Sequence, residues 1–473
     1  MNKCIEEETF PDCLKVAKVI SLYKKGDKAN PENYRPISLL SPIGKIIEKI
    51  LHKQMNKYFT KYNLYSKNQF GFRSKRSCNH AVAELTDYIR NAIDERRSGS
   101  ACFIDLKKAF DTLDHSILLQ KLYRYGFRGP IFNLIKNYLS NRKQYVLQDG
   151  KKSDVLTINT GVPQGSVLGP FLFLVYINDL PKECNQSMVT LFADDTTVYN
   201  IGQNTSEEIC NDIQNLRNWF NENKLTVNIG KCEYVCFGRA QPLSEEAFGQ
   251  RISLKGHCKY LGVIIDEKLN FKEHIKYVTK KLNKFCGLMY KVRHVFPVRC
   301  LLLFYKTIAK PIIKYGLMNY GATAKTNLDP IEKAQRRILR AIFFKKQTDS
   351  LQNVYALHNI LTIHETYIVE LVCELFRQLR GNSPFDFVAG SFIPPDINTR
   401  RRKRGLLTIT YSRTETKRRS LKNSIVKTYN WLKTLDLIPS NIRNLSENAT
   451  KNLINGIAHN YVSNNRDVFN VYF

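Results

Sequence analysis

Two adjacent carboxylates, Asp194 and Asp195, lie within the otherwise apolar and β-favouring run 191–199. This pattern predicts a tight β-hairpin with the acidic pair at its turn. Neighbouring carboxylates repel each other and are costly to desolvate, and a hard divalent cation such as Mg²⁺ removes that conflict. Two such ions can hold the attacking and leaving oxygens of a phosphoryl transfer. The alternative interpretation is an ordinary acidic surface turn.

A third carboxylate, Asp105, follows the apolar strand-like segment 101–104. A strand end is a rigid support, so Asp105 stands where a third metal ligand is needed beside the acidic pair. The alternative is an Asp that caps the following helix, which is frequent in proteins. Asp111 and Asp114 fit that capping role better than Asp105 does.

A loop punctuated by Gly and Pro, residues 159–170, lies between these acidic segments and leads into an apolar stretch. Glycines let the backbone approach a ligand closely, and a loop that enters a helix presents free N–H groups to anions. An ordinary loop–helix junction is the alternative, but such a junction does not require the polar Gln164 between Pro163 and Gly165.

The order of these segments resembles the reverse transcriptase of non-LTR, LINE-like retrotransposons of the jockey-like kind. The resemblance covers roughly the first three hundred residues and rests on several blocks in one order. These blocks are Lys24–Asp27, Asn33–Leu40, Asn68–Arg73, Phe103–Asp111, Gly161–Pro170, Phe192–Asp195, Asn228–Glu233 and Tyr260–Val263.

The resemblance implies an α+β right-hand polymerase, with fingers and palm on an antiparallel sheet followed by a helical thumb. The implied domains are an N-terminal fingers extension (1–60), fingers and palm (61–268), thumb (269–380) and a basic C-terminal segment of unknown role (381–473). It also implies that Asp105, Asp194 and Asp195 are the catalytic acids that bind two Mg²⁺ ions.

Four further residues are implied as contacts of the incoming dNTP. By resemblance, Phe110 excludes a ribose 2′-OH, Gln164 contacts the sugar, and Arg73 binds the triphosphate. Lys231 matches a block that places a proton donor for the leaving pyrophosphate. Core packing remains an alternative for Phe110, and a solvated loop position remains one for Arg73.

Two segments are implied as nucleic-acid contacts. Arg35 resembles a template-strand contact, and Tyr260, Leu261 and Gly262 resemble the primer grip, a hairpin that holds the primer terminus. The implied function is an RNA-directed DNA polymerase that adds dNTPs to a DNA primer on an RNA template. A catalytically inactive relic that only binds nucleic acid is the main alternative. An RNA-directed RNA polymerase or an intron maturase is disfavoured by Phe110 and by the block 33–40, respectively.

Composition agrees with a polyanionic partner. The chain has 73 Lys and Arg against 42 Asp and Glu, a formal net charge of +31. Such an excess also fits ribosomal or membrane-surface proteins, so charge alone indicates only a polyanion.

The twelve Cys form no CxxC pair, which favours reduced thiols inside the cell over disulfides or zinc. No secretory signal is visible, and the apolar run 167–180 is too short to span a membrane.

Hydrophobic periodicity predicts the remaining elements. Strands are expected at Leu14–Tyr23, Lys231–Gly238 and Lys259–Ile265, with a hairpin (143–146 and 153–158) around Asp149-Gly150. Helices are expected at Ile43–Tyr58, 79–97, 167–180, 206–223, His274–Val295, Pro297–Ala309 and Ile331–Phe344. The helix 297–309 is expected to stop ahead of Pro311.

A boundary is expected within residues 380–404, where Gly and Pro precede the basic run 400–404. That run fits a nucleic-acid-binding segment or a nuclear-localisation signal, and it fits an exposed linker equally well. Elements of this family carry an endonuclease ahead of the polymerase, whereas only residues 1–23 precede the first polymerase-like block here. We therefore expect a fragment of an element, or a decayed or repurposed copy.

Overall fold

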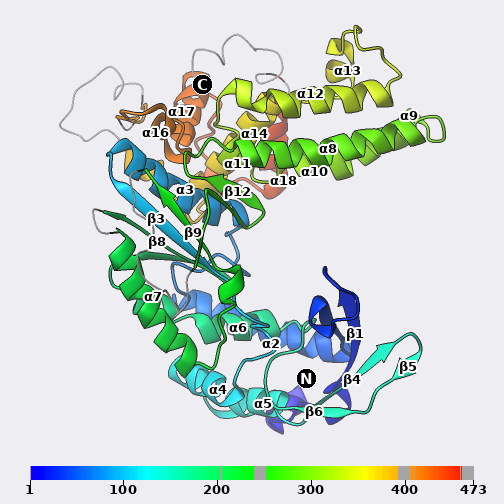
Figure 1. The fold of residues 1–473 in the computed structure, drawn as a ribbon, viewed down its shortest axis with the longest axis vertical. Coiled ribbons are helices and arrows are strands. Elements are labelled where there is room, and N and C mark those ends of the chain that lie inside the picture. Colours follow the sequence, from blue (N-terminus) through cyan, green and yellow to red (C-terminus); the bar gives the residue numbers. More distant parts are fainter. Residues whose placement is uncertain are drawn as a thin grey trace.

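The structure is a computed structural model that describes residues 2–202, 205–238, 252–391, 405–409, 411–458 and 460. Its elements form a smaller N-terminal sheet, a central five-stranded sheet and a helical end, arranged around an open concave side (Figure 1). Helix α1 (Asn2–Glu6) and a short turn precede the first strand. This arrangement fits the predicted right-hand polymerase fold.

The N-terminal sheet has the order β2-β1-β4-β5, with β6 also paired to β4. Its strands are β1 (Val16–Tyr23), β2 (Tyr34–Leu39), β4 (Arg142–Gln148), β5 (Lys151–Lys152) and β6 (Leu156–Ile158). The prediction of antiparallel pairing holds except between β1 and β4, which are parallel. These two strands are far apart in the sequence, and such a long connection permits a parallel crossover.

The hairpin predicted around Asp149-Gly150 is present. Gln148 pairs with Lys151, so Asp149 and Gly150 form a two-residue turn. Both turn residues have positive φ, 49° and 78°, which matches the twist of the flanking strands.

The central sheet has the order β10-β9-β3-β8-β7. Its strands are β3 (Ser98–Ile104), β7 (Met188–Phe192), β8 (Asp195–Gly202), β9 (Glu233–Phe237) and β10 (Ser253–Leu254). The pairs β9–β3, β3–β8 and β8–β7 are antiparallel, as predicted. The edge strand β10 pairs with β9 in parallel. Alternation along β3 directs Ala101 toward one hydrophobic core and Cys102 and Ile104 toward the other.

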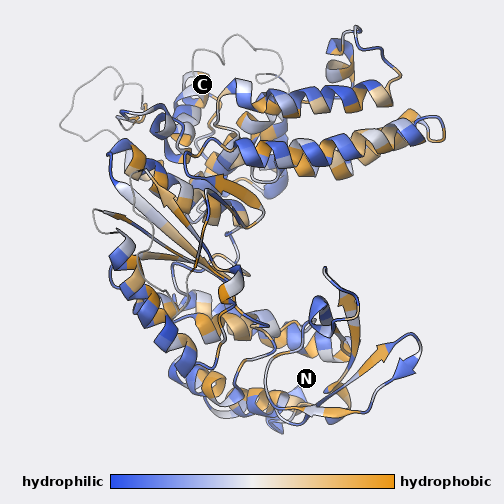
Figure 2. Ribbon diagram, viewed as in Figure 1, coloured by the Kyte–Doolittle hydropathy of each residue, from blue (hydrophilic) through white to orange (hydrophobic). Residues whose placement is uncertain are grey.

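Helices cover both faces of the central sheet. One core contains residues of α2 (Pro42–Lys61), α4 (His115–Arg124), α5 (Gly129–Leu139), α6 (Gly169–Ile177) and α7 (Thr205–Glu222). The other core contains α3 (Cys78–Asp94) and most of the helical end. Helix α6 is apolar along its whole length and buried, as expected for the run 167–180 (Figure 2). Helix α7 has an apolar side against the sheet and polar residues on its outer side.

The expected strand 259–265 is instead a separate hairpin of β11 (His257–Tyr260) and β12 (Val263–Asp266). These strands pair only with each other within the described part of the chain, so they do not extend the central sheet. The turn at Leu261 and Gly262 breaks the strand because both residues have positive φ, 45° and 83°.

The helical end contains two long helices, α8 (Lys272–Val292) and α12 (Lys325–Ile342), which project together from the sheet (Figure 1). Along the chain, α9 (Val298–Phe304), α10 (Lys310–Lys314) and α11 (Leu317–Tyr320) come between these two helices. After α12 the chain continues with α13 (Gln352–Leu357) and α14 (Ile363–Leu379). The predicted stop ahead of Pro311 is wrong. A π-helical turn over Tyr305–Ala309 connects α9 to α10, and Pro311 lies in the first turn of α10, where a missing N–H is tolerated.

The described part of the C-terminal segment packs against the rest of the helical end. Its helices are α16 (Glu415–Arg418), α17 (Leu421–Thr434) and α18 (Glu447–Ile457). The Asp87 carboxylate of α3 accepts hydrogen bonds from the Leu421 and Lys422 amides at the start of α17. Residues 411–434 are thereby joined to the polymerase-like part of the chain. The predicted basic run 400–404 lies outside the described residues.

Among the described helices, none combines the length and apolar character that a bilayer crossing requires. All twelve cysteines are free thiols.

Candidate active site

The acidic pair lies at the turn of the β7–β8 hairpin, where the sequence predicts it. Phe192 pairs with Asp195, so Ala193 and Asp194 form the turn itself. Ala193 has a φ of 55°, in the left-handed region that tight hairpin turns use. Both strands belong to the central sheet, and Leu191 is fully buried. The hairpin therefore holds the carboxylates on a rigid support.

Asp105 meets the pair from the neighbouring strand. Ile104 pairs with Thr196, so Asp105, the next residue of the chain, emerges beside Asp195 at the same end of the sheet. The Asp105 carbonyl accepts a hydrogen bond of 2.7 Å from the Asn228 amide, and its Oδ2 accepts one of 3.0 Å from the Asn228 Nδ2. The three acids that the sequence singles out are thus brought together by strand register.

The environment of these carboxylates disfavours their charged forms. Burial raises the pKa of Asp194, and the charge of Asp105 acts in the same direction, while Lys24 and Arg35 oppose it. Burial, followed by the charges of Asp194 and Asp105, raises the pKa of Asp195 to about 6. Asp195 is also exposed at the tip of the hairpin, so solvent screens part of this effect.

Three basic side chains lie within electrostatic range of the acids. Lys24 and Arg35 stand on the two sides of the loop that joins β1 and β2. Burial lowers the pKa of Lys24, as do Arg35 and Lys231, while Asp105 raises it. Lys231 Nζ lies 3.1 Å from Asp105 Oδ2. The N-terminal sheet therefore directs positive charge at the carboxylates of the central sheet.

The donor chemistry of the three acids fits a hard divalent cation. Carboxylate oxygens are the ligands that Mg²⁺ prefers, and such an ion relieves the repulsion that raises the pKa values of Asp194 and Asp195. Within the described residues, however, no three His, Cys, Asp or Glu side chains already form a ligand arrangement. Lys231 occupies Asp105 Oδ2 in this structure, so a cation there would have to displace that ion pair.

The Gly- and Pro-rich loop is tied through Gln164 to strand β2 and to the segment between β3 and α4. Its Nε2 donates to both carboxylate oxygens of Asp111 at 3.1 Å, and its carbonyl accepts from the Ser38 amide at 2.8 Å. A Cβ on Gly165 would lie 2.4 Å from the Ser38 carbonyl oxygen, so this close approach needs glycine. Of the two acids that fit a capping role better than Asp105, Asp114 caps α4, whereas Asp111 accepts the hydrogen bonds of Gln164.

Phe110 lies between two aromatic rings. It stacks on Phe173 of α6, with a centroid distance of 4.6 Å and an interplanar angle of 26°. Phe72, which is exposed, meets it edge-on at 6.4 Å. Phe110 is itself half-buried, so it belongs to the edge of the core and also faces outward.

Comparison with known proteins decides the family. Residues 23–265, about half of the chain, match the family described as reverse transcriptase (RNA-dependent DNA polymerase). The chain belongs to the reverse transcriptase family. The resemblance stated from the sequence blocks is thereby confirmed, including its jockey-like kind.

Two relatives from Drosophila melanogaster illustrate this membership. The chain is 30% identical over 368 residues to the "Probable RNA-directed DNA polymerase from transposon BS", a match of 72% of this chain and 40% of the relative. It is 28% identical over 362 residues to the "RNA-directed DNA polymerase from mobile element jockey", covering 72% and 39%. The chain therefore spans about two fifths of the length of these relatives.

Among solved structures, a telomerase of Candida tropicalis in complex with a fragment of telomeric RNA matches with a TM-score of 0.42 and 11% identity. That match covers 92% of this chain and 64% of the telomerase chain.

Arg73 of the reverse transcriptase chain is bound to its own loop. Its guanidinium donates to the carbonyl of Ser66 at 2.7 Å and to that of Gln69 at 3.4 Å, and it lies 4.7 Å above the ring of Tyr65. Burial lowers its pKa. These contacts tie Arg73 to residues 65–69, and the basic groups that the structure directs at the acids are Lys24, Arg35 and Lys231.

The same block braces the β7–β8 hairpin through Gln69, a residue that the sequence pattern did not single out as functional. The buried Oε1 of Gln69 accepts hydrogen bonds from the amides of Gly71 at 2.8 Å and Ala193 at 3.1 Å. A Cβ on Gly71 would lie 2.4 Å from the Ala193 nitrogen. The Phe70 amide also donates to the Leu191 carbonyl, and the Leu191 amide donates to the Asn68 carbonyl. Only the Gln-x-Gly spacing signals this role in the sequence.

The predicted primer-grip residues lie at the β11–β12 hairpin. Tyr260 is buried, and its ring lies 5.4 Å from that of Phe103 on β3, two residues before Asp105. Leu261 and Gly262 form the turn. The hairpin is thus packed against the strand that carries the first acid.

Proposed function

We propose that this chain is the polymerase part of a non-LTR retrotransposon protein and that it copies an RNA template into DNA. The observation that carries the proposal is the meeting of Asp105, Asp194 and Asp195 opposite the basic side chains Lys24 and Arg35. Carboxylates facing cations across an open site suit a reaction that binds a polyphosphate and transfers a phosphoryl group.

The reaction joins a primer to a dNTP. The primer 3′-hydroxyl gives its proton to water and its oxygen attacks the α-phosphorus, while the bond to the bridging oxygen of the β-phosphate breaks and pyrophosphate leaves with that electron pair. When bound, divalent cations would neutralise the polyphosphate charge and lower the pKa of the primer hydroxyl. Asp105, Asp194 and Asp195 would hold those ions. The rest of the catalysis is positioning and charge stabilisation.

Each remaining residue has a positioning role in this proposal. Lys24 and Arg35 bind the triphosphate. Lys231 breaks its ion pair with Asp105 and binds the leaving pyrophosphate. Gln164, whose amide is held by Asp111, contacts the nucleotide sugar. The role assigned to Arg73 by resemblance passes to Arg35 in this proposal, because Arg73 already donates to backbone carbonyls.

The thumb offers a surface for the nucleic-acid backbone. A groove of about 740 Å³ lies between α8 and α12. Lysines spaced four residues apart line one side of it: Lys272, Lys276, Lys280 and Lys284. Residues at this spacing share one side of a helix, so their charges form a row. Such a row suits phosphate contacts, and binding through it should weaken steeply with added salt.

Primer extension tests the proposal directly. The purified chain is given a DNA primer on an RNA template with dNTPs and Mg²⁺, and then with EDTA. Extension that depends on the template and stops with EDTA supports a reverse transcriptase. Salt-sensitive template binding without any extension would contradict the proposal and leave the nucleic-acid-binding relic.

The basic residues at the site give a sharper prediction. Lys24→Ala and Arg35→Ala should each raise the KM for dNTP by about tenfold or more, because each loses a charge-assisted phosphate contact. Arg73→Ala should instead lower the melting temperature and leave KM within about threefold, since its partners are carbonyls. Lys25→Ala is the matched control, because Lys25 is an exposed neighbour of Lys24.

Steady-state kinetics with varied dNTP, together with thermal melting, check these variants. A large increase in the KM for dNTP in Arg73→Ala, with normal KM values for Lys24→Ala and Arg35→Ala, would show that Arg73 binds the triphosphate and would contradict the proposed role of Lys24 and Arg35.

A further inference from the structure

The turn of the β11–β12 hairpin is held from the helical end by Tyr315, which lies between α10 and α11. The Tyr315 hydroxyl donates a hydrogen bond of 2.6 Å to the carbonyl oxygen of Leu261. This contact joins residues 54 positions apart in the sequence. Such a contact fixes the position of the 261–262 turn relative to the helical end.

Two glycines make this joint tight. A Cβ on Gly262 would lie 2.9 Å from Cε1 of Tyr315, so the ring lies directly against the turn. A Cβ on Gly316 would lie 2.7 Å from Cγ2 of Val263. Gly262 and Gly316 also have positive φ, 83° and 77°, which a side chain would strain. The hairpin and the segment 315–316 are therefore in direct contact on both sides.

His274 of α8 adds a third contact to the same hairpin. Its Nδ1 accepts a hydrogen bond of 3.3 Å from the Ile264 amide. Burial, together with the charges of Lys281 and Lys259, lowers the pKa of His274 to about 4, so the ring is neutral near pH 7 and accepts this bond.

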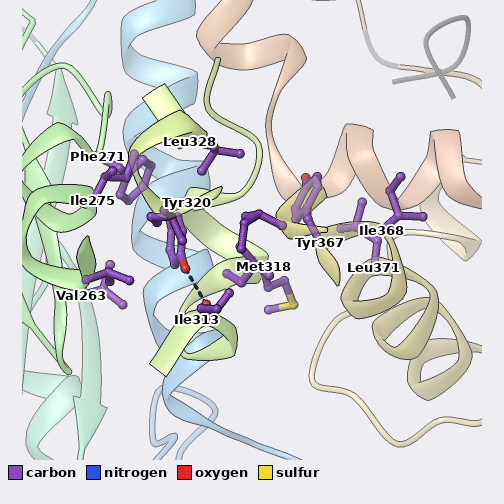
Figure 3. Packing of buried hydrophobic residues seen from close by; sticks show 14 of the residues in the cluster. Val263, Phe271, Ile275, Ile313, Met318, Tyr320, Leu328, Tyr367, Ile368 and Leu371 are labelled. Atoms are coloured by element: carbon purple, nitrogen blue, oxygen red, sulfur yellow. Dashed lines mark hydrogen bonds between the residues drawn. The ribbon is translucent and has the colours of Figure 1, made fainter. Parts of the chain in front are cut away.

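The helices behind the joint are firmly packed. Figure 3 shows Val263 of the hairpin, Ile313 of α10 and Tyr320 of α11 side by side in one hydrophobic cluster, with Tyr320 bonded to the Ile313 carbonyl. Met318 continues the cluster toward Tyr367 of α14. A shift of the helical end would therefore reach the hairpin turn through Tyr315.

The other side of the hairpin is attached to the strand that carries Asp105. Tyr260 packs on Phe103, as described above. The hairpin is thus supported from the central sheet by an aromatic contact, and from the helical end by the Tyr315 hydroxyl and by His274. Removing the hydroxyl leaves the first support in place.

We propose that Tyr315 is a positioning residue for the primer terminus, and that its bond to Leu261 couples the thumb to the polymerase site. The proposal rests on the proposed function, because it takes the 260–262 turn as the place where the primer ends. Tyr315 itself need not touch a reacting atom.

Tyr315→Phe tests the proposal in the full chain, because it removes the hydroxyl and keeps the ring against Gly262. Tyr290→Phe is the matched control, since Tyr290 is an equally exposed tyrosine at the far end of α8 (46% for both). We expect Tyr315→Phe to lower kcat for single-nucleotide extension about five- to twentyfold, with the KM for dNTP and the Kd for primer–template changed less than about twofold. The control should match the wild type.

Hydrogen exchange separates this inference from the proposed function. Tyr315→Phe should speed exchange in peptides covering 257–266 and leave those covering β3 unchanged, whether or not the chain polymerises. Faster exchange in Tyr315→Phe than in the wild type, together with a wild-type chain that does not extend primers, would confirm the joint and reject the function. Unchanged exchange and unchanged kcat would overturn the inference, as would a loss of activity that only follows a lower melting temperature.

Discussion

The double variant Asp194→Asn/Asp195→Asn should lose primer extension by at least about a thousandfold and still fold. Asparagine keeps the shape of each side chain but removes the charge that would hold a divalent cation. The backbone of the turn is held by Gln69 and by strand pairing, so the hairpin should remain in place. Single-turnover extension on a primed RNA template measures the effect.

Asp149→Asn serves as the matched control for that loss. Asp149 is an exposed acid at the turn of another hairpin, and Asn tolerates its positive φ equally well. It should retain wild-type extension. Substantial activity in the double variant would remove Asp194 and Asp195 from the catalytic site.

The acids also predict a pH-dependent effect on stability. The folded chain binds the Asp195 proton more tightly than the unfolded chain, because the pKa rises from 3.8 to about 6. The free energy of unfolding should therefore fall as pH increases between about 4 and 6. Asp195→Asn cannot titrate at this position and therefore lacks this loss of stability. In the absence of metal, the melting temperature of the variant minus that of the wild type should increase as the pH increases from about 4 to 6. A constant difference across that range would contradict this explanation of the shift.

Replacing Phe110 with Val should reduce discrimination against ribonucleotides by about ten- to a hundredfold. Stacking on Phe173 and the edge contact with Phe72 hold the Phe110 ring in one orientation, which a steric barrier to a 2′-OH requires. The variant also loses half-buried apolar contacts, so a cost of about 1–3 kcal/mol in stability is expected. The ratio of kcat/KM for dNTP and rNTP on one primer–template measures the discrimination.

Phe72→Leu separates the two roles left open for Phe110. It removes one aromatic neighbour but leaves the Phe110 ring present, so selectivity should change less than about threefold. If Phe110→Val lowers the melting temperature while the nucleotide ratio stays constant, Phe110 is a packing residue only.

Local patterns in the sequence were sufficient for the elements that carry the site. The apolar, β-favouring stretches on both sides of Asp194 and Asp195 indicate a hairpin with the acidic pair at its turn. Asp149-Gly150 indicates a two-residue turn for a similarly local reason, the positive φ that both residues adopt. The bounds of α2, α3, α7 and α8 follow helical periodicity to within a few residues.

Local patterns were insufficient where a partner comes from far along the chain. The parallel pairing of β1 with β4 and the passage of a helical segment through Pro311 both depend on neighbours that periodicity does not encode. Arg73 is a different case, because its partners Ser66 and Gln69 are close in the sequence, yet its fork of donors suits phosphate oxygens and backbone carbonyls equally well. Only the folded loop shows that carbonyls are its partners.

The sequence by itself therefore determined the family, the acidic hairpin and the strand end at Asp105, because these depend on the order and spacing of neighbouring residues. The tertiary structure alone decided that Lys24 and Arg35 face the acids, that Gln69 braces the turn, and that Tyr315 reaches Leu261. Each of these contacts joins segments that are distant in the sequence. Their geometry is set by how sheets and helices dock, and burial rather than local propensity drives that docking.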